Sequence, residues 1–273
     1  MSNPNIVHRL AYVVPTKDHP DDLRVLFNSL EKQTVFPHQL IIVDGSQPDI
    51  KYVCNEYPDL PITYERCFPP SLAKQRNAGM ARLKGNITLA GYLDDDLELD
   101  PDATEKMLKF WANAPSNTGG AAISIRNENG QKHSTLRMFF GLTGKNFGQM
   151  LPSGFAVNIP YQKKMLETQW LYGGATIWSR KVIKTFTYDE WYAGHGYLED
   201  VDFSFRVGLE YRLFVVGNST CLHHSNQLDD SQQYVFGKQQ IFNRFYFVRK
   251  IKTFSKIFFC WAIFGTILMN ITA

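Results

Sequence analysis

Three consecutive aspartates, Asp94, Asp95 and Asp96, follow directly on the apolar stretch at residues 87–93. Such a continuous apolar stretch is typical of a buried parallel strand, so the carboxylates would stand at the end of that strand. Adjacent carboxylates repel one another and stay ionised together only where a cation or hydrogen-bond donors compensate their charge. Hard divalent cations take oxygen ligands and complete their shell with a substrate diphosphate. A metal and diphosphate site is therefore one interpretation, and a solvated acidic turn before the helix that begins near Pro101 is the alternative.

A second acidic group lies at residues 196–206, which have the pattern of a helix. Glu199 and Asp200 would lie in its first turn, where the helix dipole favours carboxylates. One carboxylate that points into a cleft could act as general base toward an acceptor hydroxyl. Asp202 and Arg206 are four residues apart, which is the spacing of a structural ion pair on one helix face. Helix capping and catalysis both fit these residues.

Two adjacent histidines, His223 and His224, follow an apolar strand predicted at 213–216. Neighbouring side chains on an extended chain point to opposite sides, so only one of the two would face a metal ion. A structural role for both is the alternative.

Basic and amide side chains gather near the start of a helix predicted at 71–83, namely Lys74, Arg76 and Asn77. The N-terminus of a helix with cationic side chains suits a phosphate or a nucleotide. A solvated basic face is the alternative.

The elements that must position these groups alternate along the first hundred residues. Apolar stretches predict strands at 10–14, 40–43, 62–65 and 87–93, and helical patterns lie at 21–33, 48–57, 71–83 and 101–111. This βαβαβαβα order implies an α/β fold with a doubly wound, mostly parallel sheet flanked by helices, and ligands bind at the carboxyl ends of such strands. Thr16, Asp44 and the three aspartates each follow an apolar strand, so we expect them at that edge.

Beyond Gly119 the alternation breaks down. A strand is predicted at 121–125, and helices are predicted at 198–209 and 231–252. Residues 172–178 have the pattern of a strand or turn that is followed by a helix. Residues 127–160 are rich in Gly, Asn, Ser and Phe without a clear period, which predicts a long functional loop or a small insert.

The C-terminus joins a basic flank to an apolar stretch. The flank contains Arg244, Arg249, Lys250, Lys252 and Lys256 with no acid among them, and residues 257–273 carry no charge. A helix over that stretch would span roughly 25 Å, a little less than a hydrocarbon core of about 30 Å. The pattern predicts a membrane-associated helical tail, interfacial or a clipped span, with the main domain on the cytoplasmic side. A buried terminal helix is the alternative.

The composition excludes several classes of protein. With 273 residues, 44% of them hydrophobic and 20% charged, the chain is neither disordered nor fibrous. A formal net charge of +3 gives no electrostatic case for a nucleic-acid partner. The four cysteines are scattered without a C-x-x-C pair and no signal-peptide-like stretch stands in front, so we expect a reducing compartment and no structural zinc.

Taken in order, these motifs resemble those of the family 2 glycosyltransferases of the GT-A fold. The matching residues are Pro15-Thr16, Val43-Asp-Gly-Ser46, Arg76-Asn-Ala-Gly79, Leu93-Asp-Asp-Asp96, Gly173-Gly174, Tyr188-Asp-Glu190, Leu198-Glu-Asp-Val-Asp202, Arg206 and a late His. The resemblance covers roughly residues 8–250. It implies an inverting, nucleotide-sugar-dependent enzyme of the hexosyltransferase type. Such an enzyme would move one sugar to a hydroxyl of a glycan or lipid-linked acceptor. The resemblance also implies a role in surface polysaccharide synthesis, at the inner face of the cell membrane.

The resemblance implies a role for each donor-side residue. Thr16, preceded by Pro15, and Asp44 would hold a pyrimidine base and its ribose, and Arg76 and Asn77 would lie near the base or diphosphate. In the aspartate triplet, Asp96 would ligate Mn²⁺ or Mg²⁺, Asp95 would touch the ribose and Asp94 would support them. The donor base stays open between UDP, dTDP and GDP, with a pyrimidine favoured.

On the acceptor side, the resemblance implies that Asp200 is the catalytic base and that Glu199 helps to place the acceptor. His223 would be the late metal ligand, with His224 as the alternate. Gly173 and Gly174 would let the backbone approach the sugar or acceptor, because they carry no side chain. The expected domains are a glycosyltransferase domain at 1–250, with a nucleotide-binding half (1–115) and an acceptor-binding half (116–250), and an apolar membrane-associating segment at 251–273.

Several alternatives are weighed against this interpretation. A sugar nucleotidyltransferase would need a Gly-rich loop after the first strand, and residues 14–19 contain no glycine. A dehalogenase-type phosphatase would place its aspartates after the first strand, whereas these follow the fourth. Processive relatives carry Gln-x-x-Arg-Trp, but Phe245 follows Arg244 here, which favours transfer of a single sugar. A catalytically inactive nucleotide-sugar or glycan-binding protein at the membrane is the remaining alternative.

Overall fold

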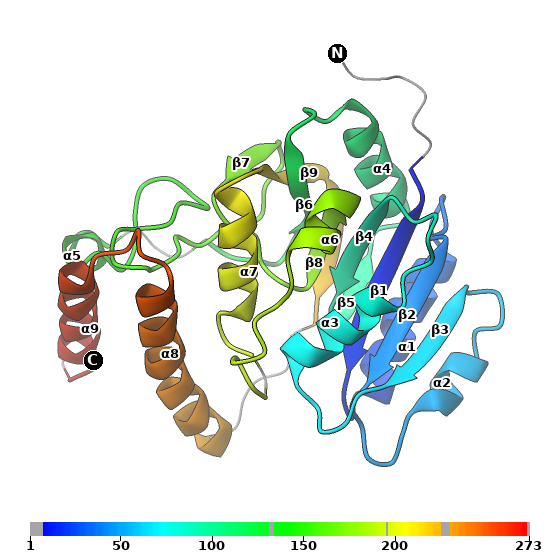
Figure 1. Cartoon of the computed structure of the whole chain (residues 1–273), viewed down its shortest axis with the longest axis horizontal. Helices are drawn as coiled ribbons and strands as arrows, with labels where there is room; N and C mark the ends of the chain where they lie inside the picture. The colour runs from blue at the N-terminus through cyan, green and yellow to red at the C-terminus, as the bar shows by residue number, and fades with distance from the viewer. Residues whose placement is uncertain (1–7, 131–133, 195, 225–229, 272–273) are drawn as a thin grey trace.

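The computed structural model describes residues 8–130, 134–194, 196–224 and 230–271 (Figure 1). In this part of the chain a central sheet has the strand order β3-β2-β1-β4-β8-β6-β9-β5, and β7 pairs with β9. Helices cover both faces of the sheet. The α/β fold class, with a central sheet flanked by helices, is therefore confirmed.

The first four strands form the parallel part of the sheet. They are β1 (Leu10–Thr16), β2 (Gln39–Asp44), β3 (Ile62–Arg66) and β4 (Leu89–Leu93). β1 pairs in parallel with β2 and β4, and β2 with β3. Along β1, Tyr12 packs into one apolar cluster and Val13 into another on the opposite face. Burial on both faces explains the continuous apolar sequences of β1, β2 and β4, whereas β3, at the edge of the sheet, is only partly buried.

Helices from the two apolar clusters enclose this sheet. One face is covered by α1 (Pro20–Glu31), α2 (Lys51–Asn55) and α4 (Ala103–Asn113). The other face is covered by α3 (Leu72–Ala81), α6 (Arg180–Thr185) and α7 (Glu199–Gly208). This doubly wound arrangement leaves the carboxyl ends of β1, β2 and β4 open at one edge, which is where ligands bind in such sheets.

The remaining strands make the sheet mixed rather than mostly parallel. They are β5 (Leu97–Leu99), β6 (Thr118–Ile125), β7 (Leu166–Thr168), β8 (Ala175–Ser179) and β9 (Arg212–His223). β8 is antiparallel to β4 and β6, β5 and β7 are antiparallel to β9, and β6 is parallel to β9. The prediction of a mostly parallel sheet thus holds for β1–β4 and is wrong for the second half. The reason is that β8 enters between β4 and β6 after a long irregular segment and not after a crossover helix.

The segment predicted as a loop or insert is largely irregular. Its described part contains the short helix α5 (Thr135–Phe139) and a single bridge between Met150 and Ala156, while residues 131–133 lie outside the described part.

Two helices end the described chain, α8 (Asp230–Lys250) and α9 (Lys256–Ile271). They lie side by side at the end of the molecule opposite α1 and α2 (Figure 1). Among the helices of the described residues, none combines the length and apolar character needed to cross a membrane. Residues 272 and 273 of the predicted apolar stretch lie outside the described part.

Candidate active site

The two predicted metal ligands, Asp96 and His223, lie together at the open edge of the sheet, and Asp94, which was expected only to support them, joins them there as a third candidate ligand. One oxygen each of Asp94 and Asp96 and one ring nitrogen of His223 lie within 4.8 Å of one another. Asp96 Oδ2 lies 3.2 Å from His223 Nε2, because β5 pairs with β9 and sets Leu97 opposite His223. Asp96 Oδ1 is buried and has no hydrogen-bond partner. This carboxylate–imidazole set fits Mn²⁺ or Mg²⁺, and it disfavours a fully solvated acidic turn.

The two histidines point to different carboxylates, as alternation on an extended chain predicts. His224 Nε2 lies 3.0 Å from Glu98 Oε2 at the surface, away from the cluster. The contact with Asp96 raises the pKa of His223. The geometry favours His223 over His224 as the metal ligand.

Asp95 turns away from its two neighbours toward β1. Its Oδ2 accepts a 2.6 Å hydrogen bond from Thr16 Oγ1 and lies 3.5 Å from His19 Nδ1. Burial raises the pKa of Asp95, and the contacts with His19 and Thr16 offset part of that rise. A cavity of about 490 Å³ opens here, and its wall includes Pro15, Thr16, His19, Ser71, Asp95 and Asp96. Its size and position suit a nucleotide at the carboxyl ends of β1 and β4.

Arg76 joins the aspartate triplet to the carboxylates of α7. Its guanidinium is buried, donates to Glu199 Oε1 over 2.7 Å and to Asp94 Oδ1 over 3.1 Å, and lies against the rings of Tyr92 and Tyr188. Burial raises the pKa of Glu199, and Arg76 lowers it by less. Glu199 thus holds Arg76 in place, and its expected role in placing the acceptor stays a prediction.

The two consecutive glycines allow this close packing. A Cβ at Gly173 would lie 2.6 Å from Arg76 Nη2, and a Cβ at Gly174 would overlap the Asp94 carboxylate. The Gly174 carbonyl accepts from the Asp94 amide over 2.8 Å, and the Gly173 amide donates to Asp200 Oδ2 over 3.0 Å. The glycines therefore make room for Asp94 and Arg76, a reason different from the expected approach to the sugar.

Asp200 borders a second cavity, of about 670 Å³, together with Asn158, Trp170, Tyr172, Tyr197 and Gln240. Besides the Gly173 amide, it accepts a 2.7 Å hydrogen bond from the Val201 amide. Burial raises the pKa of Asp200, and the nearby Arg76 offsets part of the rise. A carboxylate with a raised pKa at the wall of a cavity is suited to accept a proton.

Asn77 does not reach the nucleotide cavity. Its Oδ1 accepts from the Tyr188 amide over 2.9 Å, and its Nδ2 donates to the Tyr188 carbonyl and to Glu190 Oε1, each over 3.0 Å. These contacts give Asn77 a role in holding the 188–190 loop, so the expected nucleotide contact has no support in this geometry.

Asp44 is fully enclosed. Its carboxylate accepts from the Ser46 and Ile50 amides, from Tyr64 Oη and from Arg66 Nη1, over 2.5–3.0 Å. Burial acts to raise the pKa of Asp44, but the hydrogen bonds outweigh it and hold the pKa below its ordinary value. Asp44 could contact a nucleobase directly only if the side chain of Arg66 or Tyr64 moved away. In the observed arrangement, Asp44 holds the loop that follows β2.

Sequence reasoning missed Ser71 and Gln75 at the start of α3. Gln75 Nε2 donates to the carbonyls of Thr16 (2.9 Å) and Val43 (2.8 Å), and so ties the ends of β1 and β2 together. Ser71 Oγ is buried at the cavity wall without a hydrogen-bond partner, which leaves it available to a ligand. A serine at the first position of the helix predicted at 71–83 is the signal that could have found it.

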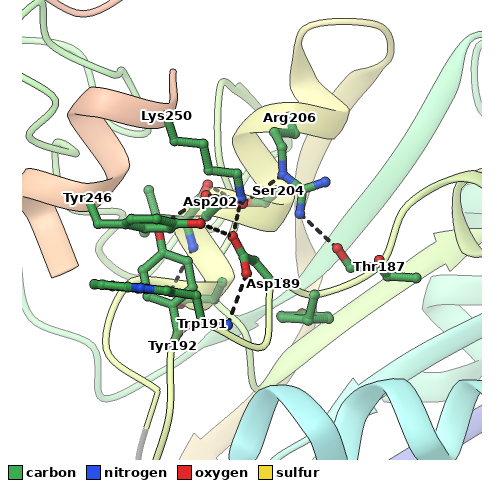
Figure 2. A network of polar contacts seen from close by, with 12 residues as sticks. Thr187, Asp189, Trp191, Tyr192, Asp202, Ser204, Arg206, Tyr246 and Lys250 are labelled. Atoms are coloured by element: carbon green, nitrogen blue, oxygen red, sulfur yellow. Dashed lines mark hydrogen bonds and ion pairs between the residues drawn. The ribbon is translucent and has the colours of Figure 1, made fainter. Parts of the chain in front are cut away.

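An ionic network anchors α7, and with it Asp200, to α8. Lys250 Nζ lies 2.8 Å from Asp202 Oδ2 and 2.7 Å from Asp189 Oδ2 (Figure 2). The predicted i,i+4 pair is confirmed, with Arg206 Nε 2.7 Å from the fully buried Asp202. Tyr192 Oη also donates to Asp202. Figure 2 shows Lys250 reaching down from α8 between the two aspartates.

We expect Lys250→Met to lower the free energy of unfolding by about 1.5–3 kcal/mol, because Asp202 stays buried with fewer donors. Lys252→Met is the matched control, since Lys252 is exposed and its loss should cost no more than about 0.5 kcal/mol. Urea unfolding measures both, and equal effects of the two changes would contradict a stabilising network.

Comparison with known proteins shows the family. Residues 12–176 match the family model described as glycosyl transferase family 2, which is more than half of the chain. The chain belongs to glycosyltransferase family 2. A relative of this family 2 chain is the uncharacterized glycosyltransferase YwdF of Bacillus subtilis (strain 168), 28% identical over 153 residues. That match covers 54% of this chain and 56% of YwdF, so the chain spans about half the length of the curated relative it matches.

Solved structures of GT-A glycosyltransferases share the fold of this family 2 chain. S. aureus TarS 1–349 in complex with UDP has a TM-score of 0.57 at 15% identity, covering 86% of this chain and 64% of that one. The mannosyltransferase PcManGT of Pyrobaculum calidifontis, in complex with GDP-Man and Mn²⁺, has a TM-score of 0.59 at 13% identity, covering 96% of this chain and 71% of that one. The GT-A fold expected from the motifs is confirmed.

Proposed function

We propose that this family 2 chain moves one sugar from a nucleotide-sugar donor to an acceptor hydroxyl, with a divalent metal and with inversion at the anomeric carbon. The proposal rests on two backbone hydrogen bonds, one made by Gly173 and one by Gly174. The Gly174 carbonyl holds Asp94, one of the candidate metal ligands, and the Gly173 amide holds Asp200, the candidate base. The residue expected to bind the metal beside the leaving group and the residue expected to activate the nucleophile are therefore held by two consecutive residues.

The two cavities match the two substrates of such a transfer. Described residues of the first hundred make most of the 490 Å³ cavity, with Gly194 as the one contribution from the second half. The 670 Å³ cavity is made by residues 137–269. This supports the expected division into a nucleotide-binding and an acceptor-binding half, with one refinement: α9, from the C-terminal segment, also contributes to the acceptor cavity.

The donor is a sugar nucleotide in this proposal. Two of the structural neighbours were solved with UDP and with GDP-Man, and TarS 1–349 also with UDP-GlcNAc. We infer a nucleoside diphosphate in the cavity beside Thr16 and Ser71, with the family resemblance favouring a pyrimidine base.

Asp94, Asp96 and His223 would hold the metal, whose charge compensates the departing diphosphate. Asp200 takes the proton from the attacking hydroxyl, and its raised pKa strengthens it as a base. Arg76 binds both Asp94 and Glu199. It thereby fixes the position of the nucleotide-binding half relative to the acceptor-binding half. Attack from the Asp200 side, opposite the leaving diphosphate, inverts the anomeric centre.

The chemistry is tested by incubating the protein with Mn²⁺, a panel of nucleotide sugars and the hydroxyl acceptors of native membranes. We expect release of one nucleoside diphosphate, and NMR of the product should show the inverted anomeric configuration. Retention of configuration would refute the single-displacement mechanism. Nucleotide-sugar binding with no release from any donor would favour the inactive binding protein.

The metal site has a matched pair of variants in the adjacent histidines. We expect His223→Ala to weaken Mn²⁺-dependent binding of nucleoside diphosphate by about 10–100-fold, as for loss of a group that supports a metal. His224→Ala should change it by no more than about twofold, because His224 pairs with Glu98. Asp96→Ala should behave as His223→Ala does. Calorimetric titration measures all three, and equal affinities in the two histidine variants would refute the ligand assignment.

We place the activity at the inner face of the cell membrane, in surface polysaccharide synthesis. The family resemblance supports the pathway, and the basic flank and apolar stretch at the C-terminus support the location.

A further inference from the structure

Large apolar side chains are exposed along α8 and α9. We call this surface the α8–α9 face; its members are Phe242, Phe245, Ile257, Phe258, Phe264 and Ile267, all exposed. Ile257 is 81% exposed and Phe242 65%. Single exposed apolar residues are ordinary, but a group of this size on two adjacent helices marks a surface that binds something apolar.

The charges on and around α8 and α9 indicate which kind of partner this surface binds. Residues 231–273 contain six basic residues and no acid. Arg249, Lys252 and Lys256 are exposed around the turn between the two helices. Exposed apolar side chains flanked by exposed cations, on a segment that contains no acidic residue, complement an anionic lipid surface.

One side of α9 is packed against the protein, while several of its large apolar side chains remain exposed. On its inner side, a Cβ at Gly265 would overlap Phe140, so helix and loop are in close contact there. Trp261 Nε1 donates to the Phe139 carbonyl over 3.0 Å and its ring packs against Phe140. α9 thus lies along the protein surface, an orientation that suits a helix in the plane of a membrane interface.

The α8–α9 face also leads to Asp200. A groove of about 400 Å³ runs between the two helices and is lined by Phe245, Phe259 and other apolar residues. Ile241 and Ile263 line this groove and also the 670 Å³ cavity that Asp200 borders. An amphiphile could therefore place a hydroxyl near Asp200 and its apolar chain in the groove.

We propose that the acceptor is a lipid-linked sugar, presented by an anionic bilayer on which the α8–α9 face lies. This inference rests on the proposed glycosyl transfer and names its acceptor class. The apolar chain of the acceptor occupies the groove between α8 and α9, and the bilayer covers the side chains around it.

Vesicle binding tests the bilayer contact. Wild-type protein is floated with vesicles of phosphatidylcholine and phosphatidylglycerol and compared with Ile257→Glu/Phe258→Glu. We expect at least tenfold weaker binding of the double variant, and weak binding of wild type to pure phosphatidylcholine. Phe36→Glu is the control, because Phe36 is 47% exposed far along the chain from α8 and α9. No binding of wild type to the anionic vesicles, or equal binding of the double variant, would overturn the proposal.

Trp261 reports the orientation independently of these variants. Lipids brominated near the headgroup should quench its fluorescence, and Trp261→Phe should remove most of the quenching. Quenching that persists unchanged in Trp261→Phe would place another surface on the bilayer and overturn the proposal.

The acceptor class is tested by the product. Sugar-labelled donors are incubated with the protein and native membranes, and the products are divided between a chloroform–methanol extract and the water-soluble fraction. We expect the label in the lipid extract, and at least tenfold less of it with Ile257→Glu/Phe258→Glu. A lipid extract without label overturns the acceptor assignment. Nucleoside diphosphate binding with Mn²⁺ is measured in parallel: its absence in wild type is the failure of the proposed function, whereas its presence confines the failure to the acceptor.

Discussion

Asp200→Asn should reduce kcat/KM for sugar transfer by about 10²–10⁴-fold, the contribution of a positioned general base. The amide keeps the size of the side chain and can still accept from the Gly173 amide, so the loop at 173–174 should keep its shape. Binding of nucleoside diphosphate should survive, because Asp200 borders the acceptor cavity and not the nucleotide cavity. Steady-state kinetics and calorimetry on the same preparation separate the two properties.

The pH profile gives a second readout for Asp200. Burial raises the pKa of Asp200, so the protonated, inactive form persists to a higher pH than for an ordinary aspartate with a pKa of about 3.9. The rate should therefore fall with decreasing pH from a point above that value, and Asp200→Asn should lose this limb. Asp59→Asn, an exposed change of the same kind, should leave rate and profile unaltered. Retained turnover in Asp200→Asn would remove this residue from the base role.

Arg76→Met should lower the free energy of unfolding by about 3–5 kcal/mol, since it leaves a buried ionised partner without its counter-charge. Glu199 is 5% exposed, and Arg76 Nη1 is its 2.7 Å partner. The double variant Arg76→Met/Glu199→Gln should recover a large part of the loss, because neither charge then remains buried. Urea unfolding of the two single variants and the double variant measures the coupling.

Arg82→Met is the matched control for Arg76. Arg82 also makes a 2.7 Å ion pair, with Glu65, but its side chain is 55% exposed. Solvent screens such a pair, so its loss should cost less than about 1 kcal/mol. A similar cost for both arginines, or no recovery in the double variant, would contradict the role of Arg76 as the link between the two halves.

The parallel half of the fold is predictable because three of its strands, β1, β2 and β4, are buried on both faces. β1, β2 and β4 consist of short apolar stretches that end at polar residues, and that pattern has few competing interpretations. β5 and β7 have three residues each, which is too short for any period to emerge. The antiparallel entry of β8 depends on the course of an irregular segment, which composition does not encode.

The site residues are predictable as a group but not in their individual contacts. Asp94, Asp96 and His223 meet because strand ends meet, a rule that the sequence pattern already contains. The contact of Arg76 with Glu199 joins residues 123 positions apart, and no spacing rule anticipates it. The enclosure of Asp44 by Tyr64 and Arg66 likewise depends on the neighbouring strand β3.

Metal-dependent nucleotide binding is the central claim of this account. Calorimetric titration of UDP, dTDP and GDP into the purified protein, first with Mn²⁺ and then with EDTA, tests it most directly. We predict that one nucleotide binds with Mn²⁺ and that its binding disappears with EDTA. Failure of all three nucleotides to bind to protein shown to be folded, or binding that EDTA leaves unchanged, would contradict the assignment of a metal site at Asp94, Asp96 and His223.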